Sequence, residues 1–316
     1  MPKDLRIVFM GTPDFAVGVL KEMVEAGKNI VGIITAPDRP AGRGRKLMGS
    51  SVKEYALSQD LKILQPTNLK NEAFLKELKE LNANLQVVVA FRMLPKAVWK
   101  MPELGAFNLH ASLLPQYRGA APINWAIINN EKKTGVTTFF IDEKIDTGAI
   151  IANKETSIEK GETAETLHDK LMEQGSKLVL KTLNLIEEGK AYTKPQLQSD
   201  ILKEAPKLTP ENTQIDWAKN GEEIDAFIRG LSPYPVAWTI LNNTNEALKT
   251  KIYAATFEKI DHHFATGSIQ TSKKELKVAC LDGYINIKEI QLPGKRKMDV
   301  LSLLNGYSFD ENAKLS

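Results

Sequence analysis

The 316-residue sequence predicts a doubly wound α/β domain with a mostly parallel sheet, followed by a small β-barrel domain. Two observations support this prediction. Short apolar runs alternate with helical patterns over the first two-thirds of the chain, which is the order of βαβ units. Short alternating strands then recur about every 8–12 residues in the last third, a spacing typical of a barrel. We therefore expect a first domain over residues 1–189, a linker over 190–209 and a second domain over 210–316.

The elements of the first domain follow from the spacing of its apolar residues. Apolar and β-branched runs predict strands at residues 5–10, 30–35, 85–91, 106–109 and 136–141. Helical spacing predicts helices at residues 14–26, 51–59, 71–81, 122–130 and 163–188. Residues 87–90 are apolar without interruption, as expected for a strand that is buried on both faces of a parallel sheet. A sheet of this class binds its ligand at the carboxyl ends of its strands.

The pattern changes near residue 190. Pro195, Pro206 and Pro210 lie among polar residues there, which indicates a linker. A helix is predicted over residues 218–231. Alternation of apolar and polar residues then predicts strands at residues 237–241, 250–257, 267–271, 275–279 and 284–291.

Composition excludes several classes of protein. Hydrophobic residues make up 42% of the chain and charged residues 26%, a balance that argues against disorder. The first residues lack the apolar core of a signal peptide, and no apolar run reaches the roughly 18 residues that a membrane-spanning helix needs. The single cysteine, Cys280, excludes an internal disulfide and a zinc site of the CxxC type. We therefore expect a cytoplasmic protein that binds no metal.

The positive charge of the sequence is concentrated in one segment. The whole chain has 42 Lys and Arg against 39 Asp and Glu, for a net charge of +3. Residues 36–53 hold five basic residues and one acidic residue, so the remainder of the chain nets −1. Gly42 and Gly44 alternate there with Arg43 and Arg45, which predicts a flexible arm whose guanidinium groups bind phosphate. A solvated loop without a ligand is the alternative interpretation.

The turn after the first predicted strand argues against a dinucleotide cofactor. Gly11 stands where the glycine-rich fingerprint of such proteins would begin. Thr-Pro-Asp-Phe follows it, so the G-x-G-x-x-G pattern is absent. The sequence therefore disfavours an NAD-dependent enzyme.

Polar residues at the ends of two predicted strands are the candidates for chemistry. Asn108 and His110 are two residues apart at the end of strand 106–109, so their side chains point to the same face. An amide and an imidazole placed in this way can stabilise a developing oxyanion. Asp142 and Asp146 lie in the loop after strand 136–141, where a carboxylate could orient His110 and take up a proton. Spacing does not decide between the two aspartates, and a buried polar pair without a chemical role is the alternative.

Asn108, His110 and Asp146, with the segment SLLP at residues 112–115, resemble the catalytic signature of the 10-formyltetrahydrofolate-dependent formyltransferases. The resemblance implies a Rossmann-like catalytic domain, an OB-like second domain and 10-formyltetrahydrofolate as the formyl donor. It also implies that Asn108 and His110 stabilise an oxyanion while Asp146 keeps His110 poised. The residues implied to line the folate cleft are Ser112, Leu113, Leu114 and Pro115.

Further segments resemble the branch of this family that formylates initiator methionyl-tRNA. These segments are LRIVFMGTPDFAV, TAPDRPAGRGRKLM, NLHASLLPQYRGAAPINWAI, IDTG, SPYP and PGKRKM. In that branch the arginine-rich insertion faces the acceptor stem of the tRNA, and the second domain also contacts the tRNA. The implied tRNA-binding residues are therefore Arg39, Arg43, Arg45, Lys46, Lys295, Arg296 and Lys297.

The catalytic signature alone leaves the acceptor open. A formyltransferase that acts on a small amine, such as an amino-sugar nucleotide, is the first alternative. A non-enzymatic module that binds folate or RNA is the second. For the tRNA-formylating enzyme we expect a monomer.

Overall fold

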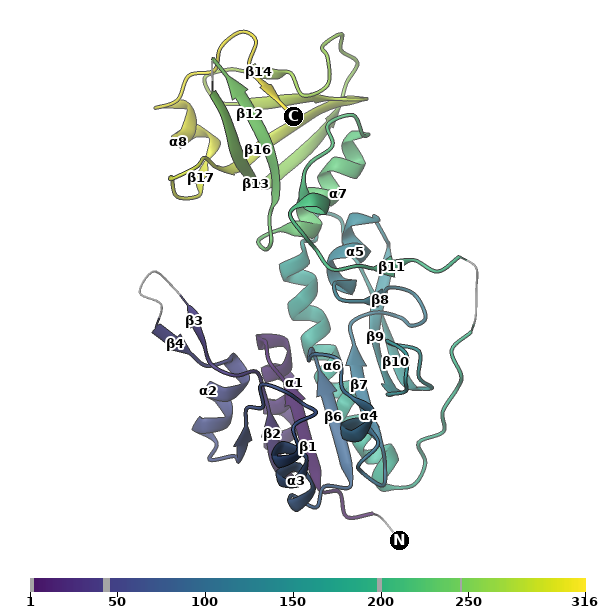
Figure 1. Cartoon of the computed structure of the whole chain (residues 1–316). Coiled ribbons are helices and arrows are strands. Elements are labelled where there is room, and N and C mark those ends of the chain that lie inside the picture. The colour runs from purple at the N-terminus through teal and green to yellow at the C-terminus, as the bar shows by residue number, and fades with distance from the viewer. Residues whose placement is uncertain (1–2, 42–45, 198–200, 245) are drawn as a thin grey trace. The chain divides into compact units, whose positions relative to one another are not determined.

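A computed structural model of the chain describes residues 3–41, 46–197, 201–244 and 246–316 (Figure 1). The chain forms two compact units. The first comprises Met1–Gly119, Thr134–Thr156 and His168–Glu204. The second comprises Ala120–Lys133, Ser157–Leu167 and Ala205–Ser316. Each unit is therefore assembled from three separate stretches of the sequence.

A mostly parallel sheet of seven strands is the framework of the first unit. Its strands are β1 (Ile7–Gly11), β2 (Ile30–Ile34), β5 (Ile63–Leu64), β6 (Leu85–Val89), β7 (Ala106–His110), β9 (Lys133–Phe140) and β10 (Ile150–Ser157). They lie in the order β10-β9-β7-β6-β1-β2-β5. The strands from β5 to β7 pair in parallel, whereas β9 pairs antiparallel with β7. This arrangement confirms the predicted Rossmann-like α/β fold.

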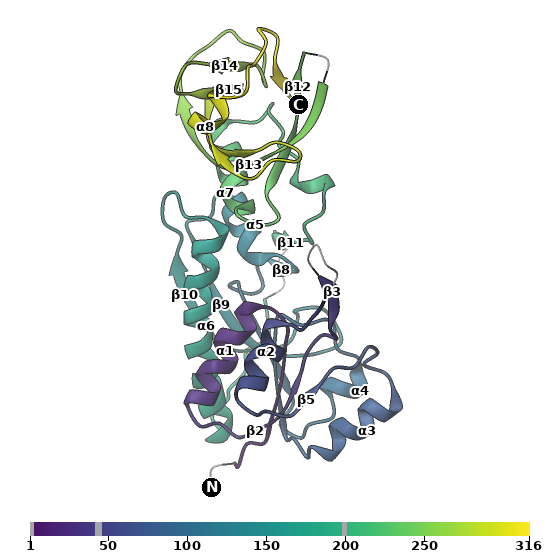
Figure 2. The ribbon, with the colours of Figure 1, turned by 90° about the vertical axis from the view of Figure 1, so that its left-hand side faces the viewer.

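Five helices accompany this sheet. They are α1 (Asp14–Glu25), α2 (Ser51–Ser58), α3 (Glu72–Glu80), α4 (Lys96–Trp99) and α6 (Ala164–Glu187). Helices α1 and α6 lie on one face of the sheet, and α3 and α4 lie on the other (Figure 2). Phe15, Val19 and Met23 recur every fourth residue of α1 and are buried, which is why this sequence forms an amphipathic helix against the sheet. None of the helices in the described ranges is long and apolar enough to span a membrane.

The second unit contains a nearly closed antiparallel barrel. Its strands are β12 (Ala237–Asn243), β13 (Glu246–Lys259), β14 (Ile269–Thr271), β15 (Leu276–Cys280), β16 (Gly283–Gln291), β17 (Met298–Asp299) and β18 (Lys314–Leu315). The order β14-β15-β16-β13-β12-β18 is closed by a bridge between Ser268 and Lys314. A hydrogen bond of 2.9 Å from the Leu315 N–H to the Gly267 carbonyl reinforces the closure. The predicted small barrel is therefore confirmed.

The second unit also contains helices. They are α5 (Pro122–Ile128), the 3-10 helix η1 (Glu211–Thr213), α7 (Gly221–Leu231) and α8 (Val300–Leu304). Ile224, Ile228 and Leu231 lie on one face of α7 and join the buried core of the barrel. These three residues are four and three positions apart, which is the helical spacing from which this helix was predicted.

Several elements differ from the sequence-based prediction. The sequence does not predict β10, because it is an edge strand without a fully buried residue and so lacks a long apolar run. The arm at residues 36–53 has more regular structure than expected, since β3 (Arg39–Ala41) pairs antiparallel with β4 (Lys46–Met48). The remaining short strands are β8 (Arg118–Gly119) and β11 (Glu204–Ala205).

Gly267 permits the closure of the barrel. Its φ is +84°, and a Cβ added there would lie 2.2 Å from the Leu315 carbonyl oxygen. We expect Gly267→Ala to lower the free energy of unfolding by about 1–3 kcal/mol, because the backbone would be strained and β18 would have to move. Urea unfolding followed by circular dichroism measures this loss. Gly306→Ala is the control, since a Cβ there meets no described atom within 4 Å, and equal stabilities of the two variants would contradict this account.

Candidate active site

Strand β7 presents Asn108 and His110 on one face of the sheet. Leu109, between them, packs against α6, where a Cβ added to Gly175 would lie 2.7 Å from Leu109 Cδ2. Successive side chains of a strand alternate, so Asn108 and His110 point to the face opposite α6. Both residues stand at the carboxyl end of β7, where sheets of this class bind their ligands.

One ring nitrogen of His110 is already engaged. The side chain is buried, and its Nε2 lies 2.8 Å from the Tyr117 carbonyl oxygen. Because a carbonyl only accepts, Nε2 carries a hydrogen in this pair. The other nitrogen, Nδ1, lies 3.9 Å from Asp146 Oδ2. Nδ1 is therefore the atom of His110 that is left for chemistry, and a carboxylate faces it.

The structure brings Asp146, and not Asp142, to His110. The Asp142 Oδ1 accepts hydrogen bonds from the Lys144 N–H (3.0 Å) and the Thr147 hydroxyl (2.8 Å), so this carboxylate closes a turn within its own loop. Asp146 Oδ2 accepts from the Gly119 N–H at 3.0 Å and faces the imidazole. Of the two aspartates, Asp146 is therefore the one that lies beside His110, and its catalytic role stays a prediction.

The loop between β9 and β10 needs an unusual backbone to present Asp146. Asp146 has φ +54°, in the left-handed region that Asp tolerates better than most residues. Gly148 then brings the chain against β9, where an added Cβ would lie 1.7 Å from the Phe140 carbonyl oxygen. The Phe140 N–H also donates to the Ala149 carbonyl at 3.0 Å. The loop is thus folded tightly back onto the end of β9.

Asn108 carries a buried polar atom without a partner. Its Oδ1 is inaccessible to solvent and makes no hydrogen bond within the part of the chain that the structure describes. Such an atom costs about 1–3 kcal/mol of stability. The oxygen and nitrogen of an amide can exchange places by a flip, so Asn108 can present either an acceptor or a donor. As it is oriented in the structure, the Oδ1 would need a hydrogen-bond donor to be satisfied.

The segment Ser112–Pro115 forms a constrained turn directly after β7. Ser112 is fully buried, its hydroxyl donates to the Gln116 carbonyl at 2.6 Å, and the Leu114–Pro115 peptide is cis. Thr137 lies opposite His110 on β9, and its hydroxyl donates to the Ser112 carbonyl at 2.7 Å. The Ser112 hydroxyl is therefore occupied within the turn. That Ser112, Leu113, Leu114 and Pro115 line a folate cleft stays a prediction.

Sequence reasoning missed two further side chains near Asp146. Gln196, in the segment expected to be a linker, contacts the loop directly, and Arg118, which follows the turn after β7, contacts Gln196. Gln196 is 50 residues from Asp146, and no periodic pattern relates the two. The sequence holds no signal that would have found this contact.

The stem of the arginine-rich arm is anchored by its one acidic residue. Asp38 Oδ2 lies 2.6 Å from Lys53 Nζ, and its Oδ1 accepts from Gln65 Nε2 at 2.8 Å. These hydrogen bonds, from Gln65 first and then Lys53, hold the pKa of the Asp38 carboxyl below its ordinary value. Lys53 is therefore paired within the protein. Arg39 is exposed on β3, whereas Arg43, Arg45 and the Lys46 side chain lie outside the described residues.

The second predicted basic cluster lies in a turn of the barrel after Gly294. Lys295, Arg296 and Lys297 are all exposed. Lys297 Nζ lies 2.7 Å from Glu289 Oε2, and this hydrogen bond raises the pKa of Lys297 above its usual range. Nζ also lies 5.4 Å from the centroid of the Tyr253 ring. Lys297 is thus held against the barrel, while Lys295 and Arg296 extend from the turn.

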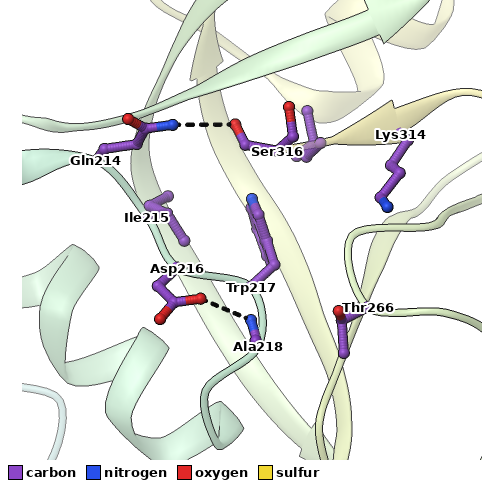
Figure 3. Close-up of a pocket in the computed structure, with 9 residues that line it drawn as sticks. Gln214, Ile215, Asp216, Trp217, Ala218, Thr266, Lys314 and Ser316 are labelled. Atoms are coloured by element: carbon purple, nitrogen blue, oxygen red, sulfur yellow. Dashed lines mark hydrogen bonds between the residues drawn. The ribbon is translucent and has the colours of Figure 1, made fainter.

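The barrel unit also has a pocket of about 460 Å³ (Figure 3). Its lining residues are Gln214, Ile215, Asp216, Trp217, Ala218, Thr266, Lys314, Leu315 and Ser316. Trp217 is buried and donates from Nε1 to the Thr239 hydroxyl at 3.0 Å, so this ring serves the core. Asp216 Oδ1 accepts from the Ala218 N–H at 3.0 Å. The pocket belongs to the second unit, whereas Asn108, His110 and Asp146 belong to the first.

Within the described ranges, no group of three or more His, Cys, Asp or Glu side chains is arranged to hold a metal ion. The chemistry assembled in the first unit is an amide, an imidazole and a carboxylate at the carboxyl end of a parallel strand. These groups can stabilise an oxyanion and move a proton.

The fold and these residues define a formyl transferase. Residues 5–183 match the formyl transferase family, residues 207–308 match the formyl transferase C-terminal domain, and the chain belongs to this family. Among curated relatives, the methionyl-tRNA formyltransferase of Flavobacterium johnsoniae is 58% identical over 311 residues, covering 98% of this chain and 99% of that protein. The methionyl-tRNA formyltransferase of Bacteroides fragilis is 50% identical over 318 residues, covering 99% and 98%.

Solved structures share the fold at low identity. An N-formyltransferase from Helicobacter canadensis, in complex with folinic acid and dTDP-3-aminofucose, matches with a TM-score of 0.63 and 20% identity, over 90% of this chain and 98% of that one. HypX from Aquifex aeolicus, in complex with tetrahydrofolic acid, matches with a TM-score of 0.64 and 17% identity. That match covers 98% of this chain and 49% of HypX. These similarities concern the fold alone.

Substitution of Gly148 tests whether the position of the loop between β9 and β10 matters for catalysis. Gly148→Ala would force the loop away from the Phe140 carbonyl and displace Asp146. A displacement of about 1 Å in a catalytic group costs on the order of 100-fold in rate, so we expect a loss of that size in formyl transfer. Single-turnover kinetics with saturating formyl donor measures it. Gly306→Ala serves as the control, and an unchanged rate in Gly148→Ala would show that the loop position is unimportant.

Proposed function

We propose that the protein transfers the formyl group of 10-formyltetrahydrofolate to the α-amino group of initiator methionyl-tRNA. The observation that carries this proposal is the placement of the Asp146 carboxylate 3.9 Å from His110 Nδ1 at the carboxyl end of β7, the strand that also presents Asn108. Curated relatives that span the whole chain at 50–58% identity bear the name of this activity. We expect the protein to act as a monomer in the cytoplasm.

The reaction assigns a task to each side chain. The neutral α-amine attacks the formyl carbon, so a C–N bond forms and the carbonyl oxygen becomes an oxyanion. Asn108 and His110 stabilise this oxyanion. The bond from the formyl carbon to N10 of the folate then breaks, and the proton lost by the amine moves to N10.

The geometry of His110 restricts how it takes part. Nε2 donates to the Tyr117 carbonyl, so proton exchange with the reacting groups runs through Nδ1. When Nδ1 is protonated, the Asp146 carboxylate at 3.9 Å stabilises the imidazolium, and a water can bridge a gap of this length. Asp146 thereby orients His110 and assists the transfer of the amine proton to N10.

The tRNA would be held by basic residues from both ends of the chain. We assign the formyl chemistry to residues 1–189, the linker to 190–209 and further tRNA contacts to 210–316. Exposed guanidinium and ammonium groups bind phosphates without reading bases. The residues proposed for this role are Arg39, Arg43, Arg45, Lys46, Lys295, Arg296 and Lys297.

Removal of the His110 imidazole tests the chemistry. Loss of one oxyanion donor lowers turnover on the order of 100- to 1000-fold, and we expect this effect from His110→Ala. The initial rate of formyl-methionyl-tRNA formation measures it, with folate binding checked by fluorescence quenching. His263→Ala, at an exposed position in the barrel unit, is the control. Near-normal turnover of His110→Ala with intact folate binding would refute the assignment.

Removal of two arginines from the arm tests the acceptor. We expect Arg43→Ala with Arg45→Ala to raise KM for charged initiator tRNA. Because each phosphate contact contributes roughly 0.7–0.9 to the slope of log affinity against log salt, the slope should become shallower by about that amount per lost contact. Kinetics over a range of KCl concentrations provides both quantities.

The control for the arm is Lys76→Ala with Lys79→Ala, which removes two exposed charges from α3. Charged elongator tRNA and an amino-sugar nucleotide serve as competing acceptors in the same assay. The opposite outcome is formylation of the sugar nucleotide at a rate that depends neither on salt nor on Arg43 and Arg45. That result would show that the acceptor is a small amine and not tRNA.

A further inference from the structure

Gln196 connects the Asp146 loop, which joins β9 to β10, to the segment that follows β7. Its Nε2 donates to the backbone carbonyls of Asp146 (2.8 Å) and Gly148 (2.9 Å). Its Oε1 accepts from Arg118, at 3.0 Å from Nε and 2.5 Å from Nη2. The amide therefore uses both of its donors and both lone pairs of its oxygen.

The surroundings of Gln196 fix the orientation of its amide. A guanidinium group only donates and a carbonyl only accepts, so the oxygen must face Arg118 and the nitrogen must face the loop. Only a neutral amide matches both partners. A carboxylate at this position could keep Arg118, but it would place a negative oxygen against the two carbonyls of the loop.

Asp146 is held at both its backbone and its carboxylate by this arrangement. Gln196 binds its carbonyl, and the Gly119 N–H binds its Oδ2 at 3.0 Å. Gly119 directly follows Arg118, whose side chain binds Gln196. The contacts thus close a ring from Asp146 through Gly119, Arg118 and Gln196 back to Asp146. Asp tolerates a φ of +54° better than most residues, and these hydrogen bonds stabilise it in that conformation.

The chain places Gln196 in this position by pairing with β10. Lys194 and Ile150 form an antiparallel bridge, with N–H to O distances of 2.8 and 2.9 Å in the two directions. The neighbouring Pro195 and Leu197 are exposed, whereas Gln196 is partly buried. The segment therefore directs one polar side chain toward the loop.

We propose that Gln196 is a positioning residue, which sets Asp146 relative to His110 through the Asp146 and Gly148 carbonyls. This inference rests on the proposed roles of Asp146 and His110. Gln196 makes none of the contacts proposed for the substrates. Its replacement should therefore lower kcat and leave KM for both substrates near the parent value.

Two variants separate the contacts of Gln196. Gln196→Glu keeps an acceptor for Arg118 and loses the donors to the loop, and Gln196→Met keeps the length and loses both. Loss of a residue that orients a catalytic group costs about 10- to 100-fold in activity, and we expect that loss in kcat for each variant. Steady-state kinetics with methionyl-tRNA and 10-formyltetrahydrofolate gives kcat and KM separately.

A spectroscopic measurement does not depend on turnover. The chain has four histidines, so the 15N signals of the His110 ring can be assigned by substitution of the others. We expect the Nδ1 signal to move in both variants, because Asp146 faces this atom. The Nε2 signal should stay in place, because its partner is the Tyr117 carbonyl.

Gln116→Met is the matched control. The Gln116 side chain also anchors the segment that contains Gln196, through the Ile201 carbonyl (3.3 Å) and the Lys203 N–H (2.9 Å). If anchoring of the segment were all that mattered, Gln116→Met would change kcat and the Nδ1 signal as Gln196→Glu does. We expect both to match the parent protein.

Each outcome decides the proposal. An unchanged kcat and Nδ1 signal in both Gln196 variants would overturn it, as would equal effects in Gln116→Met. Loss of the folded state in both variants, seen by circular dichroism, would also overturn it, because Gln196 would then be a general structural residue.

The proposed function can fail independently of the role of Gln196. If the parent protein formylates a small amine instead of tRNA, kcat on that amine tests Gln196. If the parent transfers no formyl group, the Nδ1 signal still decides.

Discussion

The hydrogen bond between His110 Nε2 and the Tyr117 carbonyl determines how the rest of the site is built. It fixes the ring in a buried position and leaves Nδ1 as the atom that can exchange a proton. A carboxylate that assists Nδ1 must then approach the free edge of the ring. Strand β7 has the sequence AFNLH and contains no carboxylate that could do this. The antiparallel neighbour β9 ends beside the start of β7, where Phe140 pairs with Phe107, and the loop that follows β9 folds back to bring Asp146 to His110.

Bringing Asp146 to this position has a cost in backbone conformation. A non-glycine residue in the left-handed region costs on the order of 1–3 kcal/mol, and the return of the chain toward β9 allows no side chain at position 148. The hydrogen bonds from Gly119 and Gln196 offset this cost. In the proposed mechanism, a fixed carboxylate needs no reorganisation when charge develops on His110, which would be the physical advantage of such a loop. The Oδ1 of Asn108 is a second polar atom with a cost, because the described part of the chain provides no donor for it.

The parts of the structure that could be predicted from the sequence are those with a local pattern. The buried strands and the long helices have apolar spacings, and their predicted and observed bounds differ by a few residues at most positions. Asn108 and His110 could be paired because strand geometry relates residues two apart. The choice of Asp146 over Asp142 depends on how the loop after β9 folds back, with Asp146 in the left-handed region, and spacing does not reveal this. Gln196 depends on a bridge between distant segments, and β10 is an edge strand with polar side chains, so neither leaves a periodic signal.

Some basic residues of the two clusters are already paired with carboxylates in the structure, so the number of basic residues overstates the charge that is free to bind phosphate. Lys53 adds to the positive charge of residues 36–53 in the sequence, but in the structure its ammonium group is bound to Asp38. Lys297 is likewise bound to Glu289. A lysine that is already paired must exchange a carboxylate for a phosphate, so it gains little on binding and releases few counterions. Arg39, Lys295 and Arg296, which are exposed, are better placed to bind a polyanion than Lys53 or Lys297. The affinity for tRNA should therefore depend on which bases are paired in the free protein, and the net charge of +3 is a poor measure of it.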